Sequence, residues 1–322
     1  MRVALDATPL TVPTGGIRRY TEQLQRALTS EFPEDFFGLL PPQTGRWWST
    51  GLPRALVRGE YTLFHGTDFA VPYLPSVPAV MTLHDLSPWH AEWHGETSSR
   101  VRRRTPWLLR LGLAAMVITP TEAIRREAIA RFGLDPDRVR AVPHGVDALF
   151  RPEATHSAEP YLLAVGTHGR RKNLPMAVVA ARATGLELWI AGRGEPVASE
   201  PGVRILGAVD EAALPRLYAR ATAFLFPSHY EGFGLPILEA MACGTPVIAS
   251  KDPALVEVAG GAALHCDAND THQWVEAIAS ARDRRSELVE RGLTHAAGFT
   301  WARTARLTRQ VYEAALCRRR AR

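Results

Sequence analysis

Two glutamates, Glu231 and Glu239, flank a glycine-rich stretch whose residue types suit the binding of an anionic, hydroxylated ligand. Residues 222–227, just before this stretch, are apolar and aromatic, which predicts a buried strand. The glycines within 232–234 permit a tight turn, and Pro236 suits the first turn of a helix. Backbone N–H groups at a helix start attract phosphate. We therefore expect the two carboxylates beside them to accept hydrogen bonds from sugar or ribose hydroxyls.

A cationic loop is the second part of this candidate site. Arg171 and Lys172 follow a predicted strand and precede a predicted helix. Cations at a helix start oppose the helix dipole, and a bound diphosphate would remove that conflict. Arginine can hold phosphate oxygens in a bidentate manner, and lysine acts as a point charge. With the backbone of Phe233, Gly234 and Leu235 they would form a diphosphate site; the alternative is a solvated basic turn.

Two smaller motifs in the first half of the chain also carry chemistry. Gly15 and Gly16 join the first predicted strand to the first helix, where exposed N–H groups can meet phosphate or sugar oxygens. His84 and Asp85 end another apolar run, and a histidine there can donate a hydrogen bond to a sugar hydroxyl or an oxyanion. The alternative for the glycine loop is a purely structural turn, and the alternative for His84 is a histidine packed within the protein or on its surface.

These residues need strands to position them, and the pattern supplies ten. The predicted strands are residues 3–6, 62–65, 80–84, 116–119 and 140–143, then 161–165, 186–191, 203–206, 223–227 and 246–249. They alternate with helical patterns, which is typical of parallel sheets with crossover helices, so we predict an α/β protein with two doubly wound domains. Ligands bind beyond the carboxyl ends of such strands, where most of the candidate residues fall.

Composition limits the class of protein. A chain of 322 residues suits two domains, and 46% hydrophobic and 22% charged residues indicate a globular rather than a disordered protein. Residues 1–6 predict a strand rather than a signal peptide, and no apolar run is long enough to cross a membrane. Three scattered cysteines fit a reducing cytoplasm. The net charge of +5 suits anionic ligands, but no motif indicates nucleic acid binding.

The chain also resembles a known family. The stretch 231–246 is similar, nearly residue for residue, to the Glu-x7-Glu motif of retaining GT-B glycosyltransferases of the family-4 group. Residues 166–173 resemble the family's Arg/Lys diphosphate clamp, in the form of its mannosyltransferase-like members, and His84-Asp85 matches its His-Asp signature. The resemblance implies a GT-B fold, with two Rossmann-like domains facing each other across a cleft.

The polar stretch 151–160 predicts the boundary between the two domains, and the resemblance implies that the last helix returns to the first domain. Residues 1–153, completed by a C-terminal helix at 302–322, would form the acceptor domain. Residues 154–301 would form the donor domain, which binds the nucleotide sugar.

Family roles follow for the residues that match. The resemblance implies that Glu231 holds hydroxyls of the transferred sugar and that His84 contacts this sugar or assists proton transfer, so these two are the candidate catalytic residues. It implies that Glu239 holds the ribose hydroxyls and that backbone near Val209 meets the nucleotide base. The loop at Gly16 would contact phosphate or sugar oxygens.

Further features of the first half leave alternatives open. Arg18 stands where many relatives have glycine, and would either add a cation to the acceptor side or lie on the surface. The basic stretch 98–111, with Trp107, would either lie on an anionic membrane or form a solvated helix face. Four tryptophans would either stack on sugars or pack within the protein: Trp47, Trp48, Trp89 and Trp93.

We therefore predict a retaining, metal-independent glycosyltransferase that moves a hexose from a nucleoside diphosphate sugar to an acceptor hydroxyl in glycan or polysaccharide synthesis. GDP-mannose is the first choice of donor, from the form of the cationic loop alone. We expect a glycan or lipid-linked acceptor, no metal, cofactor or nucleic acid, and a cytoplasmic location with peripheral contact to the inner face of the membrane. Asp135-Pro-Asp137 matches the letters of a metal-binding motif, but we interpret it as a turn. The alternatives are another GT-B activity, such as a phosphorylase or epimerase, and a non-enzymatic nucleotide or glycan binder.

Overall fold

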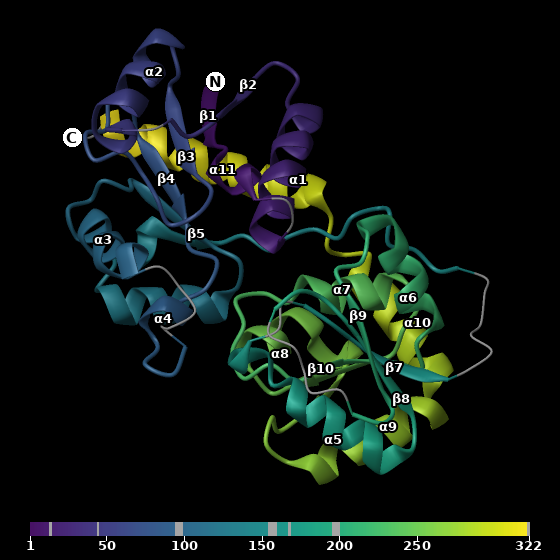
Figure 1. Ribbon diagram of the computed structural model, residues 1–322. Coiled ribbons are helices and arrows are strands. Elements are labelled where there is room, and N and C mark those ends of the chain that lie inside the picture. Colours follow the sequence, from purple (N-terminus) through teal and green to yellow (C-terminus); the bar gives the residue numbers. More distant parts are fainter. Residues whose placement is uncertain are drawn as a thin grey trace. The chain divides into compact units, whose positions relative to one another are not determined.

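The chain forms two compact units (Figure 1). The computed structural model describes residues 1–12, 15–43, 45–93, 99–153, 160–166, 169–194 and 200–320. Met1–Gly145 and Thr300–Arg322 make up the first unit, and Val146–Phe299 make up the second. The predicted boundary between residues 153 and 154 lies a few residues further along the chain, and most of the polar stretch around it lies outside the described residues.

The first unit is built on a parallel sheet of six strands in the order β2-β1-β3-β4-β5-β6. Its strands are β1 (Arg2–Asp6), β2 (Phe36–Leu40), β3 (Leu63–Gly66), β4 (Ala79–Thr82), β5 (Met116–Thr119) and β6 (Val139–Ala141). Its helices are α1 (Gly16–Glu31), α2 (Leu52–Arg58), α3 (Ser99–Arg110), α4 (Glu122–Phe132) and α11 (Trp301–Arg320). The strand order reverses between β1 and β3, so the carboxyl ends of these strands are the expected ligand side.

Two helices from opposite ends of the chain share the core of this unit. Tyr20 and Leu24 of α1 lie four positions apart on one helix face and are almost fully buried. α11, drawn in yellow, runs beside α1 and adds Trp301 and Tyr312 to the same core (Figure 1). The final helix is therefore part of the first unit.

The second unit is also a parallel sheet of six strands, in the order β12-β11-β10-β7-β8-β9. Its strands are β7 (Tyr161–Val165), β8 (Glu187–Ala191), β9 (Val203–Gly207), β10 (Ala223–Phe226), β11 (Val247–Ser250) and β12 (Leu264–Cys266). Its helices are α5 (Leu174–Thr184), α6 (Leu214–Arg220), α7 (Leu235–Ala242), α8 (Pro253–Ala259), α9 (Thr271–Asp283) and α10 (Arg285–Ala296). Separate hydrophobic cores cover the two faces of the sheet, which makes it doubly wound. Its strand order reverses between β7 and β10.

All ten predicted strands are present, with ends within two residues of the prediction. Two strands were missed, β2 and β12, and each lies at an edge of its sheet. β2 has a glycine, Gly38, at its centre and an exposed Phe36, and β12 is only three residues long. Edge strands bury fewer side chains, so the hydrophobic pattern that predicts a strand is weak there.

Candidate functional site

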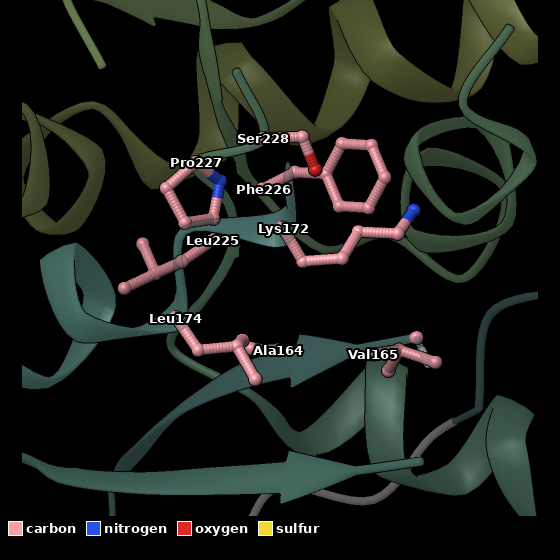
Figure 2. A pocket seen from close by; sticks show the side chains of 9 residues that line it. Ala164, Val165, Lys172, Leu174, Leu225, Phe226, Pro227 and Ser228 are labelled. Carbon is pink, nitrogen blue, oxygen red and sulfur yellow. The ribbon is translucent and has the colours of Figure 1, made fainter. Parts of the chain in front are cut away.

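A small cavity marks the switch point of the second sheet. The ends of β7 and β10 line it, together with Lys172 and Leu174, and its volume is about 10 Å³ (Figure 2). Figure 2 shows the Lys172 side chain extending past Phe226, and the ammonium nitrogen lies 5.0 Å from the centre of that ring. A cation therefore lies where doubly wound folds bind ligands.

Three charged side chains meet beside this cavity. The Lys172 ammonium donates a hydrogen bond of 2.5 Å to Oε1 of Glu231, and Nη1 of Arg171 donates one of 3.0 Å to Oε2. The side chains of Arg171, Lys172 and Glu231 are 16%, 18% and 8% exposed, so little water screens these pairs. The structure thus brings together the cationic loop and the first glutamate, which lie about 60 residues apart in the chain.

Backbone contacts fix the cationic loop in place. Residues Arg170–Lys172 form a single 3-10 turn, and Nη1 of Arg171 also donates to the Tyr230 carbonyl at 2.6 Å. The His229 N–H in turn donates to the Arg171 carbonyl at 2.9 Å. These bonds hold Arg171 against the segment that carries Glu231. Thr167 and His168, which belong to the predicted clamp motif, lie outside the described residues.

Electrostatics keep Glu231 ionised. Burial by itself would raise the pKa of this carboxyl group, but the charges of Lys172 and Arg171 outweigh burial and lower the pKa to about 2. At neutral pH the three groups therefore carry two positive charges and one negative charge.

The start of α7 has the predicted geometry of a glycine turn. Gly234 precedes the helix with φ of 90°, a conformation that favours glycine, and a Cβ on it would lie 2.7 Å from Cδ2 of Leu255, so that side chain would have to shift. Phe233 is buried and packs edge-on against Phe299. Leu235 is the first residue of the helix, where backbone N–H groups lack helical partners.

Glu239 is a buried carboxylate within α7. It is 2% exposed, and its Oε2 accepts a hydrogen bond of 3.0 Å from the Tyr218 hydroxyl. Val209, the predicted neighbour of the nucleotide base, is partly buried and packs against the core that contains Tyr218. The predicted roles of both residues stay predictions.

Sequence reasoning missed several residues around this site. Asp252 caps α8 by accepting hydrogen bonds from the N–H groups of Ala254 and Leu255, and burial, the main cause, together with the charge of Glu231 raises its pKa to about 7. The pair Asp252-Pro253 is a typical helix start and was a usable signal. Asn173 precedes α5, and its side chain makes no cap to the helix but donates to the Ala268 carbonyl.

In the first unit, His84 lies two residues beyond the end of β4. Its Nε2 contacts the Thr67 carbonyl at 2.7 Å, and because a carbonyl can only accept, Nε2 must carry a proton. Burial lowers the pKa of His84, which favours the neutral ring, and in that ring Nδ1 carries no proton and can accept a hydrogen bond. The Asp85 carboxylate accepts hydrogen bonds from the N–H and the hydroxyl of Ser87, and its charge partly offsets the effect of burial on the pKa of His84.

The glycine loop in this unit is open at Gly16. A Cβ on this residue would meet nothing within 4 Å. Arg18, the departure from the family pattern, donates to the carbonyls of Leu10 and Val12 and pairs with Glu22. Arg18 therefore stabilises the loop before α1.

Acidic residues missed by sequence reasoning lie at the switch point of the first sheet. Burial raises the pKa of Asp6, at the end of β1, to about 6. Burial and the charges of Asp6 and Asp85 raise the pKa of Asp68, just after β3, to about 7. Arg104 of α3 partly offsets these charges. Each of these acids stands at or just after the end of a predicted strand, and the carboxyl ends of neighbouring parallel strands meet at one edge of the sheet. Their positions in the sequence could therefore have indicated this acidic cluster.

The interpretation of residues 135–137 as a turn is confirmed. Asp135 accepts a bond from the N–H of Asp137, which makes that motif a turn. His144 stacks on Trp301, and a Cβ on Gly145 would lie 2.2 Å from the Trp301 nitrogen, so this segment packs closely against the start of α11. Trp47 is buried, and Trp89 packs against aromatic rings.

Comparison with known proteins shows which class of protein has this fold and these motifs. Residues 159–283 match the family of glycosyl transferases group 1, and residues 20–150 match Glycosyltransferase Family 4. Sucrose-phosphate synthase from Thermosynechococcus elongatus has a TM-score of 0.81 at 20% identity, covering 97% of this chain and 98% of that chain. Anabaena Alr3699/HepE, solved with UDP and glucose, has a TM-score of 0.76 at 15% identity, covering 98% and 100%. The fold is therefore GT-B, with two Rossmann-like domains, as predicted.

Sequence relatives identify the family. O-antigen chain mannosyltransferase B of Escherichia coli is 33% identical over 314 residues, which cover 86% of this chain and 79% of the relative. D-inositol 3-phosphate glycosyltransferase of Acidothermus cellulolyticus is 31% identical over 284 residues, and the match spans 76% of this chain and 63% of that protein, less than two thirds. This chain belongs to the family-4 group of GT-B glycosyltransferases.

Proposed function

We propose that the protein is a retaining, metal-independent hexosyltransferase that uses a nucleoside diphosphate sugar. The cluster of Arg171, Lys172 and Glu231 beside the switch point of the second sheet carries this proposal. Two cations and the start of α7 suit a diphosphate, and a carboxylate held between the cations suits sugar hydroxyls. HepE, which shares the fold, was solved with UDP and glucose, and this supports the same class of donor.

GDP-mannose is the donor that we propose, with a glycan or lipid-linked acceptor. The form of the cationic loop favours mannose, and a 33% identical relative is an O-antigen chain mannosyltransferase. The reaction would belong to the synthesis of a glycan or polysaccharide in the cytoplasm.

The proposed chemistry assigns a task to each group. The acceptor hydroxyl attacks the anomeric carbon on the face that the phosphate leaves, and its proton passes to a leaving phosphate oxygen. Lys172, Arg171 and the N–H groups at Gly234 and Leu235 stabilise the negative charge of the leaving group, and in this scheme they do so without a metal. Nδ1 of His84 accepts a hydrogen bond from a sugar hydroxyl, while Glu239 and Val209 hold the ribose and base.

Slow release of GDP from GDP-mannose tests the proposal. Purified protein should release GDP, and Lys172→Ala or Glu231→Ala should greatly reduce the release. Arg170→Ala is the matched control, because Arg170 is an exposed cation of the same turn. Unchanged turnover in Lys172→Ala would refute the assignment of the clamp.

A thermal-shift comparison of GDP, UDP, ADP and dTDP tests the base. A nucleotide at 100 times its dissociation constant stabilises the fold by about 2.7 kcal/mol. Stabilisation without turnover of any nucleotide sugar would favour a binding protein, and cleavage that requires inorganic phosphate would favour a phosphorylase.

We also propose that α3 brings the enzyme to an anionic membrane surface. Trp107 is 66% exposed and Leu111 63% exposed, and they lie among the exposed arginines Arg100, Arg103 and Arg110. This combination is typical of helices that lie at a lipid surface. No helix in the described part of the chain is long and apolar enough to cross a membrane.

Vesicle sedimentation separates this proposal from a solvated helix face. The protein should sediment with phosphatidylglycerol vesicles but not with phosphatidylcholine vesicles, and Trp107→Ala with Arg103→Gln should weaken the association. Equal sedimentation of the variant and the native protein would contradict the proposal.

A further inference from the structure

The carboxylate of Glu231 competes with the diphosphate for the same hydrogen-bond donors. In the structure this carboxylate accepts a hydrogen bond of 2.5 Å from the Lys172 ammonium and one of 3.0 Å from Nη1 of Arg171. The same Nη1 also donates to the Tyr230 carbonyl at 2.6 Å, so part of its capacity is already used within the protein. A diphosphate that binds through these same N–H groups therefore shares them with Glu231 or displaces it.

The space beside Lys172 leads to the same conclusion. The cavity lined by Lys172, Phe226 and Ser228 has a volume of about 10 Å³, which is about the volume needed for one water molecule. Phosphate groups are larger than water, so this cavity cannot hold one as it stands. Glu231 is the carboxylate that pairs with both cations, so it is the group that a phosphate on these cations would displace.

We propose that Glu231 occupies the place of the diphosphate on Lys172 and Arg171 when the site holds no donor, and that it returns there after sugar transfer to expel the nucleoside diphosphate. This inference rests on the proposed function, in which Glu231 binds hydroxyls of the donor sugar. With the donor bound, the sugar holds the carboxylate away from the cations. After transfer the sugar leaves, and Glu231 is again free to compete for them.

Charge explains why the effect favours release of product. The three side chains carry a net charge of +1 with Glu231 ionised, and replacing Glu231 by glutamine raises the net charge to +2. A nucleoside diphosphate without sugar gains nothing from Glu231 and loses by its repulsion. We therefore expect Glu231→Gln to bind such an anion about tenfold more tightly, a change of about 1.4 kcal/mol in binding free energy.

Calorimetric titration with inorganic pyrophosphate, GDP and UDP tests this inference. The proteins are the native chain, Glu231→Gln and Glu290→Gln; the last removes an equal charge from an exposed position on α10. Pyrophosphate and at least one nucleotide should bind Glu231→Gln about tenfold more tightly than the native chain. Glu290→Gln should bind them as the native chain does.

The outcomes separate this inference from the proposed function. Turnover of a nucleotide sugar by the native chain, together with equal or weaker diphosphate binding by Glu231→Gln, would overturn the inference and leave the function intact. No binding of any of the three anions by the native chain would overturn both. Thermal unfolding with and without pyrophosphate shows that Glu231→Gln is folded, and the ligand-induced rise in its Tm should exceed that of the native chain.

Discussion

Replacing Lys172 by methionine should destabilise the protein at neutral pH, and this destabilisation should disappear in acid. Pairing lowers the pKa of Glu231 from 4.5 to about 2, and at 1.36 kcal/mol per unit this shift corresponds to about 3 kcal/mol of stability. Arg171 remains in the variant and keeps part of this contribution. We therefore expect Lys172→Met to lower the free energy of unfolding by about 2 kcal/mol at pH 7.

The pH dependence follows from the sign of the shift. Because the pKa of Glu231 is lower in the folded than in the unfolded protein, its contribution is complete above pH 4.5 and is lost as the pH falls towards 2. The difference between Lys172→Met and the native chain should therefore shrink over this range. Urea unfolding between pH 7 and pH 3 measures it, with Arg170→Met as the control for an exposed cation of the same turn.

A double variant separates stability from function. Removing both partners of a buried ion pair is often nearly neutral, whereas removing one leaves a charge unpaired. Lys172→Met combined with Glu231→Gln should thus recover most of the lost stability and remain unable to release GDP from GDP-mannose. The reasoning is refuted if the two substitutions destabilise additively, or if Lys172→Met is as stable as Arg170→Met at pH 7.

Three further predictions concern other parts of the fold. Gly234→Ala should destabilise the protein by about 1–3 kcal/mol, because alanine disfavours φ of 90° and its Cβ would lie 2.7 Å from Cδ2 of Leu255; a Tm equal to that of the native chain would contradict this. Tyr218→Phe should cost about 1–3 kcal/mol in urea unfolding, since Glu239 loses a buried donor, and an unchanged midpoint would show that this bond contributes little. Asp68→Asn should stabilise the protein by about 1–2 kcal/mol at pH 8, because the raised pKa of Asp68 makes its charge unfavourable in the folded state. This gain should disappear as the pH falls through 7 towards 4, and a gain that did not depend on pH would refute this origin.

The periodicity of the sequence predicted most of the fold. Buried strands such as β5 and β7 are continuous apolar runs and were located to the residue. β12 has only three residues, one of them His265, and too little of it is buried to produce a pattern. Its pairing with β11 is a tertiary contact, which local reasoning does not see.

The sequence predicted which residues belong to the candidate site but not which of them contact one another. The motifs indicated that Lys172 binds phosphate and that Glu231 binds sugar hydroxyls. They did not indicate that the two side chains bind each other. Their direct pairing depends on the chain path that brings β7 and β10 side by side, and this path is set by the strand order. The Tyr218 hydroxyl that binds Glu239 comes from α6, which carries no motif.

The shared core of α1 and α11 has a consequence for the order in which the chain matures. During synthesis the second unit, Val146–Phe299, is finished while the apolar side of α1 still lacks Trp301 and Tyr312. The first unit therefore completes its hydrophobic core only after the ribosome has made α11. A chain truncated after Phe299 should be digested by protease first within residues 1–145, and equal resistance of both units would argue against this dependence.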